Sequence, residues 1–301
     1  MNEHYEERIL KIGAVVCAVL AALALSVWRD VSAGAPDASP RDYFLDVGQG
    51  DSELIVFHGN VKVMTDAGPD TSVLASLARV MPPGDRYIDV AIISHPQLDH
   101  FNGFNFILDH YAIGAFIVNG RDNTATAHQW SELLAKIKAH KIPLIVFGAG
   151  DRIRYGDDEI DILSPDGQFA QSAELADTGL VELVKTPEFQ TLLAADIGSK
   201  VEEYLVAHGS DLRADVLKVG HHGSKTSSEV GFLAAVGAKV AVIEAGAHNM
   251  YSYPAKETLS RLAAAGANIF RTDQNGTVEI SANGRALDVF SENRLPDKLS
   301  Q

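Results

Sequence analysis

Residues 43–280 alternate between short apolar segments and segments with helical spacing, and this order constrains the fold more than any other feature. Residues 90–93 form a continuous apolar run, which is typical of a strand buried on both faces. Residues 72–80 instead repeat their apolar side chains at the period of a helix. Many short strands with helices between them predict an α/β fold in which two packed sheets carry helices outside, an αββα sandwich.

The other predicted elements continue this alternation. Strands are expected near residues 43–47, 53–57, 61–64, 115–118, 144–147, 160–163, 180–184, 191–194, 216–219, 240–243, 268–270 and 277–280. Helices are expected near residues 104–110, 129–140, 200–207, 230–236 and 256–265. The Pro-containing stretch 31–41 is typical of a linker, so we predict a main domain over residues 42–291 and a tail over residues 292–301.

The N-terminal residues 1–30 contain an almost wholly apolar run, residues 12–28, that follows Arg8 and Lys11. Its length is at the short end for a membrane-spanning helix. We predict an uncleaved transmembrane anchor; a secreted protein is the alternative, because Ala33-Gly34-Ala35 resembles a signal-peptide cleavage site. The basic residues favour a cytoplasmic N-terminus. The protein would then be a single-pass protein of the cell membrane with its main domain outside the cytoplasm.

Composition limits the chemistry of this chain. The formal net charge of −15 argues against nonspecific coating of nucleic acid, although a local patch or a metal could still hold a phosphate. The single cysteine, Cys17, excludes an internal disulfide and a cysteine-based metal site. Any metal ligands must therefore be His, Asp or Glu.

The strongest candidate site is the loop Ser94-His95-Pro96-Gln97-Leu98-Asp99-His100, directly after the buried strand. Loops at strand ends are where α/β proteins place functional residues. His95, Asp99 and His100 combine imidazole with carboxylate, which suits Zn²⁺, Mn²⁺ or Fe. The alternative interpretation is a polar loop with two surface histidines.

Two further strand ends carry candidate ligands. His221 and His222 lie between glycines, which allow the backbone to approach a ligand closely, although a histidine pair is also compatible with a solvated loop. Asp196 follows another apolar run, where an aspartate is also common as a turn residue. For Asp46, Asp51 and Asp66 we favour a structural role or the orientation of metal-binding histidines.

Together these motifs resemble those of the ComEC-like group of metallo-β-lactamase-fold hydrolases. That group includes the hydrolase domain of the ComEC DNA-uptake channel and stand-alone proteins with an N-terminal membrane segment. The resemblance runs from about residue 43 to residue 280 and rests on these ordered motifs: Phe44-Leu45-Asp46-Val47-Gly48-Gln49-Gly50-Asp51, Thr65-Asp66-Ala67-Gly68, Ser94 to His100, Asp196, Ala214 to Ser227, and Arg271-Thr272-Asp273-Gln274-Asn275-Gly276-Thr277. It implies a metallo-β-lactamase fold for the main domain.

The resemblance also implies a metal site with one or two divalent ions, zinc being favoured and manganese the alternative. The implied metal ligands are His95, Asp99, His100, Asp196 and His221. The sequence does not decide between His221 and His222 as the ligand, and we favour His221. The candidate catalytic residues are Asp99, His222 and Lys225, and Lys225, Ser224 or Arg271 could take up substrate charge.

Several positions depart from the family pattern. Gln97 stands where the family has His or Asp, and Tyr253 stands where it has His. Ala176 and Gly179 replace the polar residues of an Asn-x-x-Ser motif, and Ala195 replaces the Gly of a Gly-Asp pair. One metal site, formed by Asp99, His100, Asp196 and His221, is then intact, while the other has lost a ligand at Gln97.

The expected function is metal-dependent hydrolysis through a metal-activated water. The resemblance implies a phosphodiester substrate, in a small molecule or in nucleic acid. The rival hypothesis is a catalytically impaired protein of the same fold that serves as a membrane-tethered binding module. The departures at Gln97, Tyr253, Ala176 and Gly179 are what a degenerate active site would show, and fold alone does not establish function. The sequence predicts a membrane as partner, through the N-terminal helix, and no protein partner.

Overall fold

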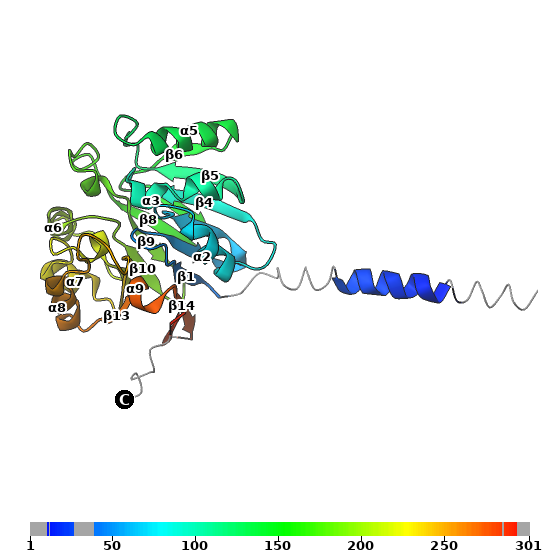
Figure 1. Cartoon of the computed structure of the whole chain (residues 1–301). Helices are drawn as coiled ribbons and strands as arrows, with labels where there is room; N and C mark the ends of the chain where they lie inside the picture. Colours follow the sequence, from blue (N-terminus) through cyan, green and yellow to red (C-terminus); the bar gives the residue numbers. More distant parts are fainter. Residues whose placement is uncertain (1–10, 12, 27–38, 285, 294–301) are drawn as a thin grey trace, which may run out of the picture. The chain divides into compact units, whose positions relative to one another are not determined.

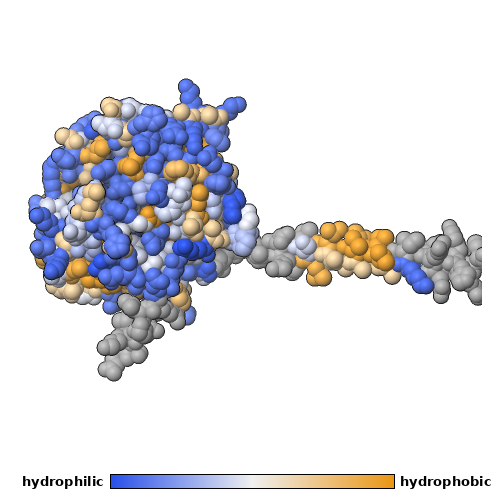
Figure 2. All heavy atoms as spheres, viewed as in Figure 1, coloured by the Kyte–Doolittle hydropathy of each residue, from blue (hydrophilic) through white to orange (hydrophobic). Residues whose placement is uncertain are grey.

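The computed structural model describes residues 11, 13–26, 39–284 and 286–293. The chain divides into two units, one made of residues 1–36 with 82–85 and the other of residues 37–81 with 86–301. Lys11 and residues 13–26 of the first unit are helical. Their apolar side chains, such as Val15 and Leu20, are exposed, and they form the orange surface of the helix in Figure 2.

The predicted transmembrane segment is not confirmed. Within the described residues, no helix combines the length and the apolar character needed to cross a bilayer. Ile12, residues 27–28 and most of the predicted linker lie outside the described residues.

The second unit contains two mixed sheets among the residues that the structure describes (Figure 1). The first has eight strands in the order β15-β14-β1-β2-β3-β4-β5-β6. Its strands are β1 (Arg41–Phe44), β2 (Glu53–Val56), β3 (Lys62–Thr65), β4 (Tyr87–Ile93), β5 (Ala112–Val118), β6 (Leu144–Val146), β14 (Val278–Asn283) and β15 (Ala286–Ser291). Strands β3 to β6 run parallel to one another.

The second sheet has seven strands in the order β13-β12-β11-β10-β9-β8-β7. Its strands are β7 (Arg152–Tyr155), β8 (Asp158–Ser164), β9 (Val181–Lys185), β10 (Gln190–Leu193), β11 (Val216–Lys218), β12 (Val240–Ile243) and β13 (Asn268–Arg271). Strands β10 to β13 are parallel. The α-helices of this unit are α2 (Ser72–Val80), α3 (Leu98–Phe101), α4 (Phe104–Ile107), α5 (His128–Ala139), α6 (Ser199–Ala207), α7 (Val230–Val236), α8 (Lys256–Ala264) and α9 (Thr272–Asn275), with 3-10 turns η1 (His58–Asn60), η2 (Ala176–Thr178) and η3 (Gly220–Gly223).

Three buried clusters produce the layers of this unit. Neighbouring residues of a strand face opposite sides, so Leu54 packs under the helices α2 to α5 while Ile55 packs between the two sheets. On the second sheet, Leu217 packs with the helices α6, α7 and α8, whereas Val216 belongs to the layer between the sheets. The αββα sandwich predicted from the sequence is therefore confirmed.

Most predicted elements match the structure closely. The predicted helices at residues 72–80 and 230–236 coincide with α2 and α7. The edge strands β7 and β15 were not predicted. Both carry charged or exposed residues, and β7 is partly to fully exposed along its length, so neither shows the apolar pattern on which the prediction relied.

Candidate metal centre

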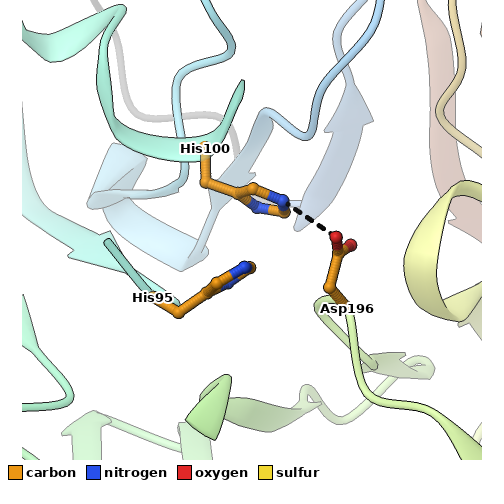
Figure 3. Close-up of side chains that lie close together, drawn as sticks. All are labelled: His95, His100 and Asp196. Carbon is orange, nitrogen blue, oxygen red and sulfur yellow. Dashed lines mark ion pairs between the residues drawn. The ribbon is translucent and has the colours of Figure 1, made fainter. Parts of the chain in front are cut away.

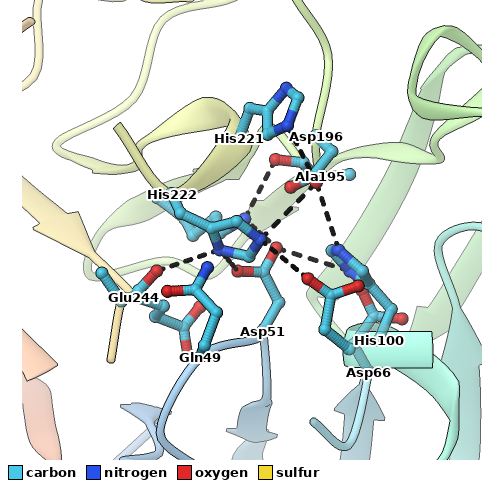
Figure 4. Close-up of polar contacts among 12 residues, drawn as sticks. Gln49, Asp51, Asp66, His100, Ala195, Asp196, His221, His222 and Glu244 are labelled. Carbon is cyan, nitrogen blue, oxygen red and sulfur yellow. Dashed lines mark hydrogen bonds and ion pairs between the residues drawn. The ribbon is translucent and has the colours of Figure 1, made fainter. Parts of the chain in front are cut away.

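The candidate site lies where several parallel strands end. Asp66 follows β3, the loop of His95 to His100 follows β4, Asp196 follows β10, and His222 follows β11. Carboxyl ends of parallel strands in one sheet meet at one edge, which is where α/β sheets place their ligands. Because the two sheets are stacked, loops from both of them contribute to one cluster (Figure 4).

The first group of candidate ligands consists of His95, His100 and Asp196, all of them buried (Figure 3). Nε2 of His100 lies 3.3 Å from Oδ2 of Asp196, and the rings of His95 and His100 are 4.2 Å apart. The nearest ligand atoms of all three lie within 4.8 Å of one another, close enough for one ion to reach them. The structure therefore brings together three of the predicted ligands.

The second group shares His100 with the first and adds Asp99 and His222. Nε2 of His222 lies 3.3 Å from Oδ2 of Asp99 and 3.6 Å from Oδ2 of Asp196. Asp196 thus stands between the two groups, as the bridging carboxylate of a two-metal site would.

The geometry favours His222 over His221 as the ligand. His222 is 2% exposed and belongs to two candidate groups, whereas the side chain of His221 is 31% exposed, belongs to none of the groups found within the described residues, and has its Nε2 3.8 Å from Asp196. Both histidines have positive φ angles in the left-handed region, which turns consecutive side chains in unusual directions. Our preference for His221 rested on the family motif and could not include this turn.

Carboxylates fix the orientation of the two central histidines. Nδ1 of His100 lies 2.7 Å from Oδ2 of Asp66, and Nδ1 of His222 lies 3.1 Å from Oδ1 of Asp51 and 3.0 Å from the backbone oxygen of Glu244. Each ring therefore directs its Nε2 toward Asp196. Asp51 and Asp66 thus occupy the orienting position proposed for them. The side chain of Asp46 instead accepts a bond from the backbone N–H of Gly48, which is a structural role.

Lys218 is a fully buried cation that the sequence analysis gave no role. Its Nζ contacts Asp51 and donates to the backbone oxygen of Ala195, 2.9 Å away. Glu244, also fully buried, accepts from the backbone N–H of Ser52. Lys218 stands at the end of an otherwise apolar strand, and this position could have indicated its role, because a buried charge requires a partner.

The ionisable side chains of this cluster have strongly shifted pKa values. Burial alone would lower the pKa of His222, but the charges of Asp196 and Asp51 raise it to about 10. Burial would likewise lower the pKa of His100, and the same carboxylates with Asp66 raise it well above its usual range. Burial would raise the pKa of Asp196, but His222 and His100 hold it well below its usual range. The negative charges of these carboxylates are stabilised by nearby positive charge, which either protons on the histidines or a metal ion can supply.

The residues present fit a divalent metal ion. Among the described residues, Nε2 of His100, Nε2 of His222 and Oδ1 of Asp196 are buried without a hydrogen-bond partner. Buried polar atoms nearly always have a hydrogen-bond partner, so several that lack one and face each other are suited to bind an ion. Imidazole nitrogens and carboxylate oxygens are the donors that zinc and similar ions bind.

Gln97 already has a partner in this arrangement. Its Oε1 lies 2.6 Å from Nε2 of His95. The pKa of His95 is lowered to about 4, chiefly by burial and then by the charge of His100, so the ring is neutral at pH 7. A neutral ring with its proton on Nε2 donates to Gln97, and an ion could bind that nitrogen only after both the bond and the proton were lost.

The remaining departures lie close to Asp196 or to the histidines. A Cβ atom at Gly179 would lie 3.0 Å from Cβ of Ala195, whose φ is +46°. The ring of Tyr253 lies 5.7 Å from that of His221 and 6.4 Å from that of His222. Substitutions that the sequence shows far apart therefore surround one site.

Two other predicted residues lie apart from the candidate groups. Lys225 is exposed, and its backbone oxygen accepts from Arg261. The guanidinium of Arg271 is bound to Asp273, with Nε 2.9 Å from Oδ1. Neither belongs to the ligand groups found in the described part of the chain.

Comparison with known proteins gives relatives in sequence. No family model matches the chain. ComE operon protein 3 of Bacillus subtilis is 26% identical over 258 residues, which are 80% of this chain and 33% of that protein. Competence protein ComA of Neisseria gonorrhoeae is 29% identical over 241 residues, which are 78% of this chain and 31% of that protein. The chain therefore spans about a third of the length of these relatives.

Solved structures share the fold. The metallo-beta-lactamase fold protein YhfI from Bacillus subtilis aligns with a TM-score of 0.53 at 12% identity, over 83% of this chain and 99% of that one. CmlA, a diiron beta-hydroxylase from Streptomyces venezuelae, aligns with a TM-score of 0.50 at 13% identity, over 79% of this chain and 53% of that one. With the motifs and the geometry above, these similarities show that the chain resembles the ComEC proteins over most of its length and has the metallo-β-lactamase fold.

Proposed function

We propose that this chain is a metal-dependent hydrolase that acts on a phosphodiester. The observation that carries the proposal is the cluster of Asp99, His100, Asp196 and His222, in which Nε2 of both histidines and Oδ1 of Asp196 are buried without hydrogen-bond partners among the described residues. A divalent ion bound there would lower the pKa of a water molecule to about 7 and polarise a phosphoryl oxygen.

The protein's own residues would prepare that site. Asp66 and Asp51 hold the Nδ1 atoms of His100 and His222, so that both Nε2 atoms remain available at the centre. Burial would raise the pKa of Asp99, but the close approach of His222 and the charges of His100 and His222 lower it to about 2. Asp99 is therefore ionised at neutral pH, and its side chain is 28% exposed, which places a carboxylate at the open side of the cluster.

Zinc is the proposed ion, with manganese as the alternative, because the donor set combines nitrogen and oxygen without sulfur. We further propose that the group containing Asp99 and His222 fills first. The group containing His95 would be weaker, because Gln97 occupies the nitrogen that the ion needs.

The proposal is tested by measuring the metal content and the phosphodiesterase activity of the purified full-length chain. Asp196→Ala should remove the metal and the activity, since Asp196 approaches both His100 and His222. Asp161→Ala, which removes the same charge from strand β8 outside the candidate groups, should retain both. An unchanged metal content in Asp196→Ala would show that the site is elsewhere.

A second candidate function is that of a binding module with an impaired active site. Gln97 bound to His95, Tyr253 beside His221, and Gly179 beside Ala195 are the observations that favour it. A chain that binds metal stoichiometrically yet hydrolyses no phosphodiester would support this second function and exclude the first.

We also propose that the chain is tethered to the cell membrane with its main domain outside the cytoplasm. The exposed apolar side chains of residues 13–26 and the basic residues before them support this. Alkaline phosphatase fused to the C-terminus should be active in a bacterial host, because it folds only outside the cytoplasm. Activity of a cytoplasmic reporter at the same position would exclude the orientation.

A further inference from the structure

The loop of residues 249–254 is fixed beside the candidate metal centre. Oδ1 of Asn249 accepts from the backbone N–H groups of Tyr251 and Tyr253, at 3.2 Å and 2.9 Å. Its Nδ2 donates to the backbone oxygens of Gly246 and Tyr253, both at 2.8 Å. A single side chain thus satisfies four backbone groups and holds the loop in one shape.

The same loop is joined to the turn that carries the two histidines. The backbone N–H of Ala255 donates to the oxygen of Gly223, at 2.9 Å. A Cβ atom at Gly223 would lie 2.6 Å from Cβ of Pro254, so the two segments touch where glycine leaves room. The position of the loop relative to His222 is therefore determined by backbone contact.

This loop presents a stack of aromatic rings. The rings of Tyr251 and Tyr253 are 5.5 Å apart at an angle of 20°, and the ring of Tyr253 in turn lies 6.4 Å from that of His222. Tyr251 is 59% exposed, and Met250 beside it is 87% exposed. The largely exposed ring of Tyr251 is therefore stacked on Tyr253, whose ring lies near a candidate metal ligand.

An open ring held rigidly in this way suits a planar ligand. Nucleobases stack on aromatic side chains regardless of sequence, because every base has a π face. A tyrosine ring presents that face with few rotatable bonds, so little conformational entropy is lost when a base binds. A phosphodiester at the metal cluster would carry its neighbouring base toward this stack.

We propose that Tyr251, supported by Tyr253, forms a platform that binds a nucleobase next to the phosphodiester and thereby selects nucleotide substrates. This inference rests on the proposed function. Tyr251 acts as a specificity-determining residue that binds the substrate outside the metal cluster.

The test compares two phosphorothioate oligonucleotides that resist hydrolysis, one of deoxythymidine and one of equal length with a tetrahydrofuran in place of every base. Calorimetry with the full-length protein should show tighter binding of the base-containing strand. Tyr251→Ala should weaken that binding by about 10-fold to 100-fold and leave the abasic strand unchanged. Tyr251→Phe should retain the preference, because the ring remains. Tyr155→Ala, an exposed tyrosine on strand β7, serves as the matched control and should behave as the wild type.

Equal affinity of the wild type for both strands, or equal loss of both in Tyr251→Ala, would overturn the platform. The metal content of each variant shows whether the centre is intact. Hydrolysis without base preference would refute the platform and leave the hydrolase standing. Base preference without hydrolysis would support the platform and refute the hydrolase.

Discussion

At the scale of single residues, one amide distinguishes the two candidate metal groups. Gln97 stands two residues after His95, and its oxygen contacts the nitrogen that would face an ion. Amide oxygen is a poor substitute for the imidazole nitrogen that zinc binds at about 2.0–2.1 Å. In the group that contains Asp99, Nε2 of His222 has no hydrogen-bond partner among the described residues.

We therefore expect Gln97→His to raise metal occupancy towards two ions per chain. Gln97→Ala is the matched control: it frees Nε2 of His95 but supplies no new ligand, so its occupancy should stay near that of the wild type. Elemental analysis of the full-length protein measures both. Hydrolytic activity should rise with Gln97→His if the rest of the site is competent.

Two results would alter this account. Higher occupancy without higher activity would favour the binding-module function. A wild type that already holds two ions with full activity would show that another residue completes the first group.

At the scale of elements, the loop after β10 and the residue that follows the turn η2 lie against each other. The family pattern that the motifs resemble has Gly before the aspartate and Ser at the position after η2, whereas this chain has Ala195 and Gly179. Ala195 adopts a φ of +46°, which costs a non-glycine residue roughly 1–2 kcal/mol, and its Cβ lies 3.0 Å from the place that a Cβ at position 179 would occupy. A side chain at position 195 therefore leaves little room for one at position 179.

The close approach of positions 179 and 195 predicts a non-additive pair of mutations. Gly179→Ser alone should destabilise the protein, since its Cβ would lie only 3.0 Å from that of Ala195. Ala195→Gly alone should change stability little, because relief of the strained φ offsets the greater freedom of glycine in the unfolded chain. The double variant should be more stable than the sum of the two single effects by about 1 kcal/mol. Denaturant unfolding measures all four proteins, and strict additivity would show that the two residues do not interact.

At the scale of the whole molecule, buried carboxyl groups join the two sheets. Oγ of Thr191 on β10 donates to Asp42 on β1, and Oγ of Thr65 on β3 donates to Glu182 on β9. Burial raises the pKa of Asp42 to about 7 despite the hydrogen bond from Thr191. Burial also raises the pKa of Glu182 to about 8. Both groups are therefore protonated in the folded protein at mildly acidic pH.

These raised pKa values predict that stability falls as pH rises. At pH values between the ordinary carboxyl pKa and the raised one, the folded state binds more protons than the unfolded state. The stabilisation that these two carboxyl groups give the folded protein is therefore complete below about pH 4 and is lost as the pH rises to about 7 to 8. A pKa difference of one between the folded and unfolded states corresponds to about 1.4 kcal/mol, so Asp42 alone contributes a few kcal/mol. Asp42→Asn should therefore gain stability relative to the wild type between pH 5 and pH 8.

The measurement is the free energy of unfolding of both proteins across that range. The exposed Asp109→Asn is the control, and its curve should run parallel to that of the wild type. A constant difference between Asp42→Asn and the wild type would contradict the assigned protonation.

The sequence by itself determined the sandwich, most of its elements and which residues could bind a metal. Apolar runs and helical spacing are local properties, so α2 and α7 were predicted to the residue. The motifs placed His95, Asp99, His100 and Asp196 at strand ends, and parallel strands bring such ends together. Residue type and position along a strand were sufficient for these conclusions.

Only the tertiary structure decided how those residues meet. The geometric preference for His222 over His221 depends on two consecutive left-handed backbone conformations. The bond between Gln97 and His95, the contact between Lys218 and Asp51, and the stack of Tyr251 on Tyr253 depend on the directions of side chains. Such directions are set by packing between segments far apart in the chain, and no local pattern of residues encodes them.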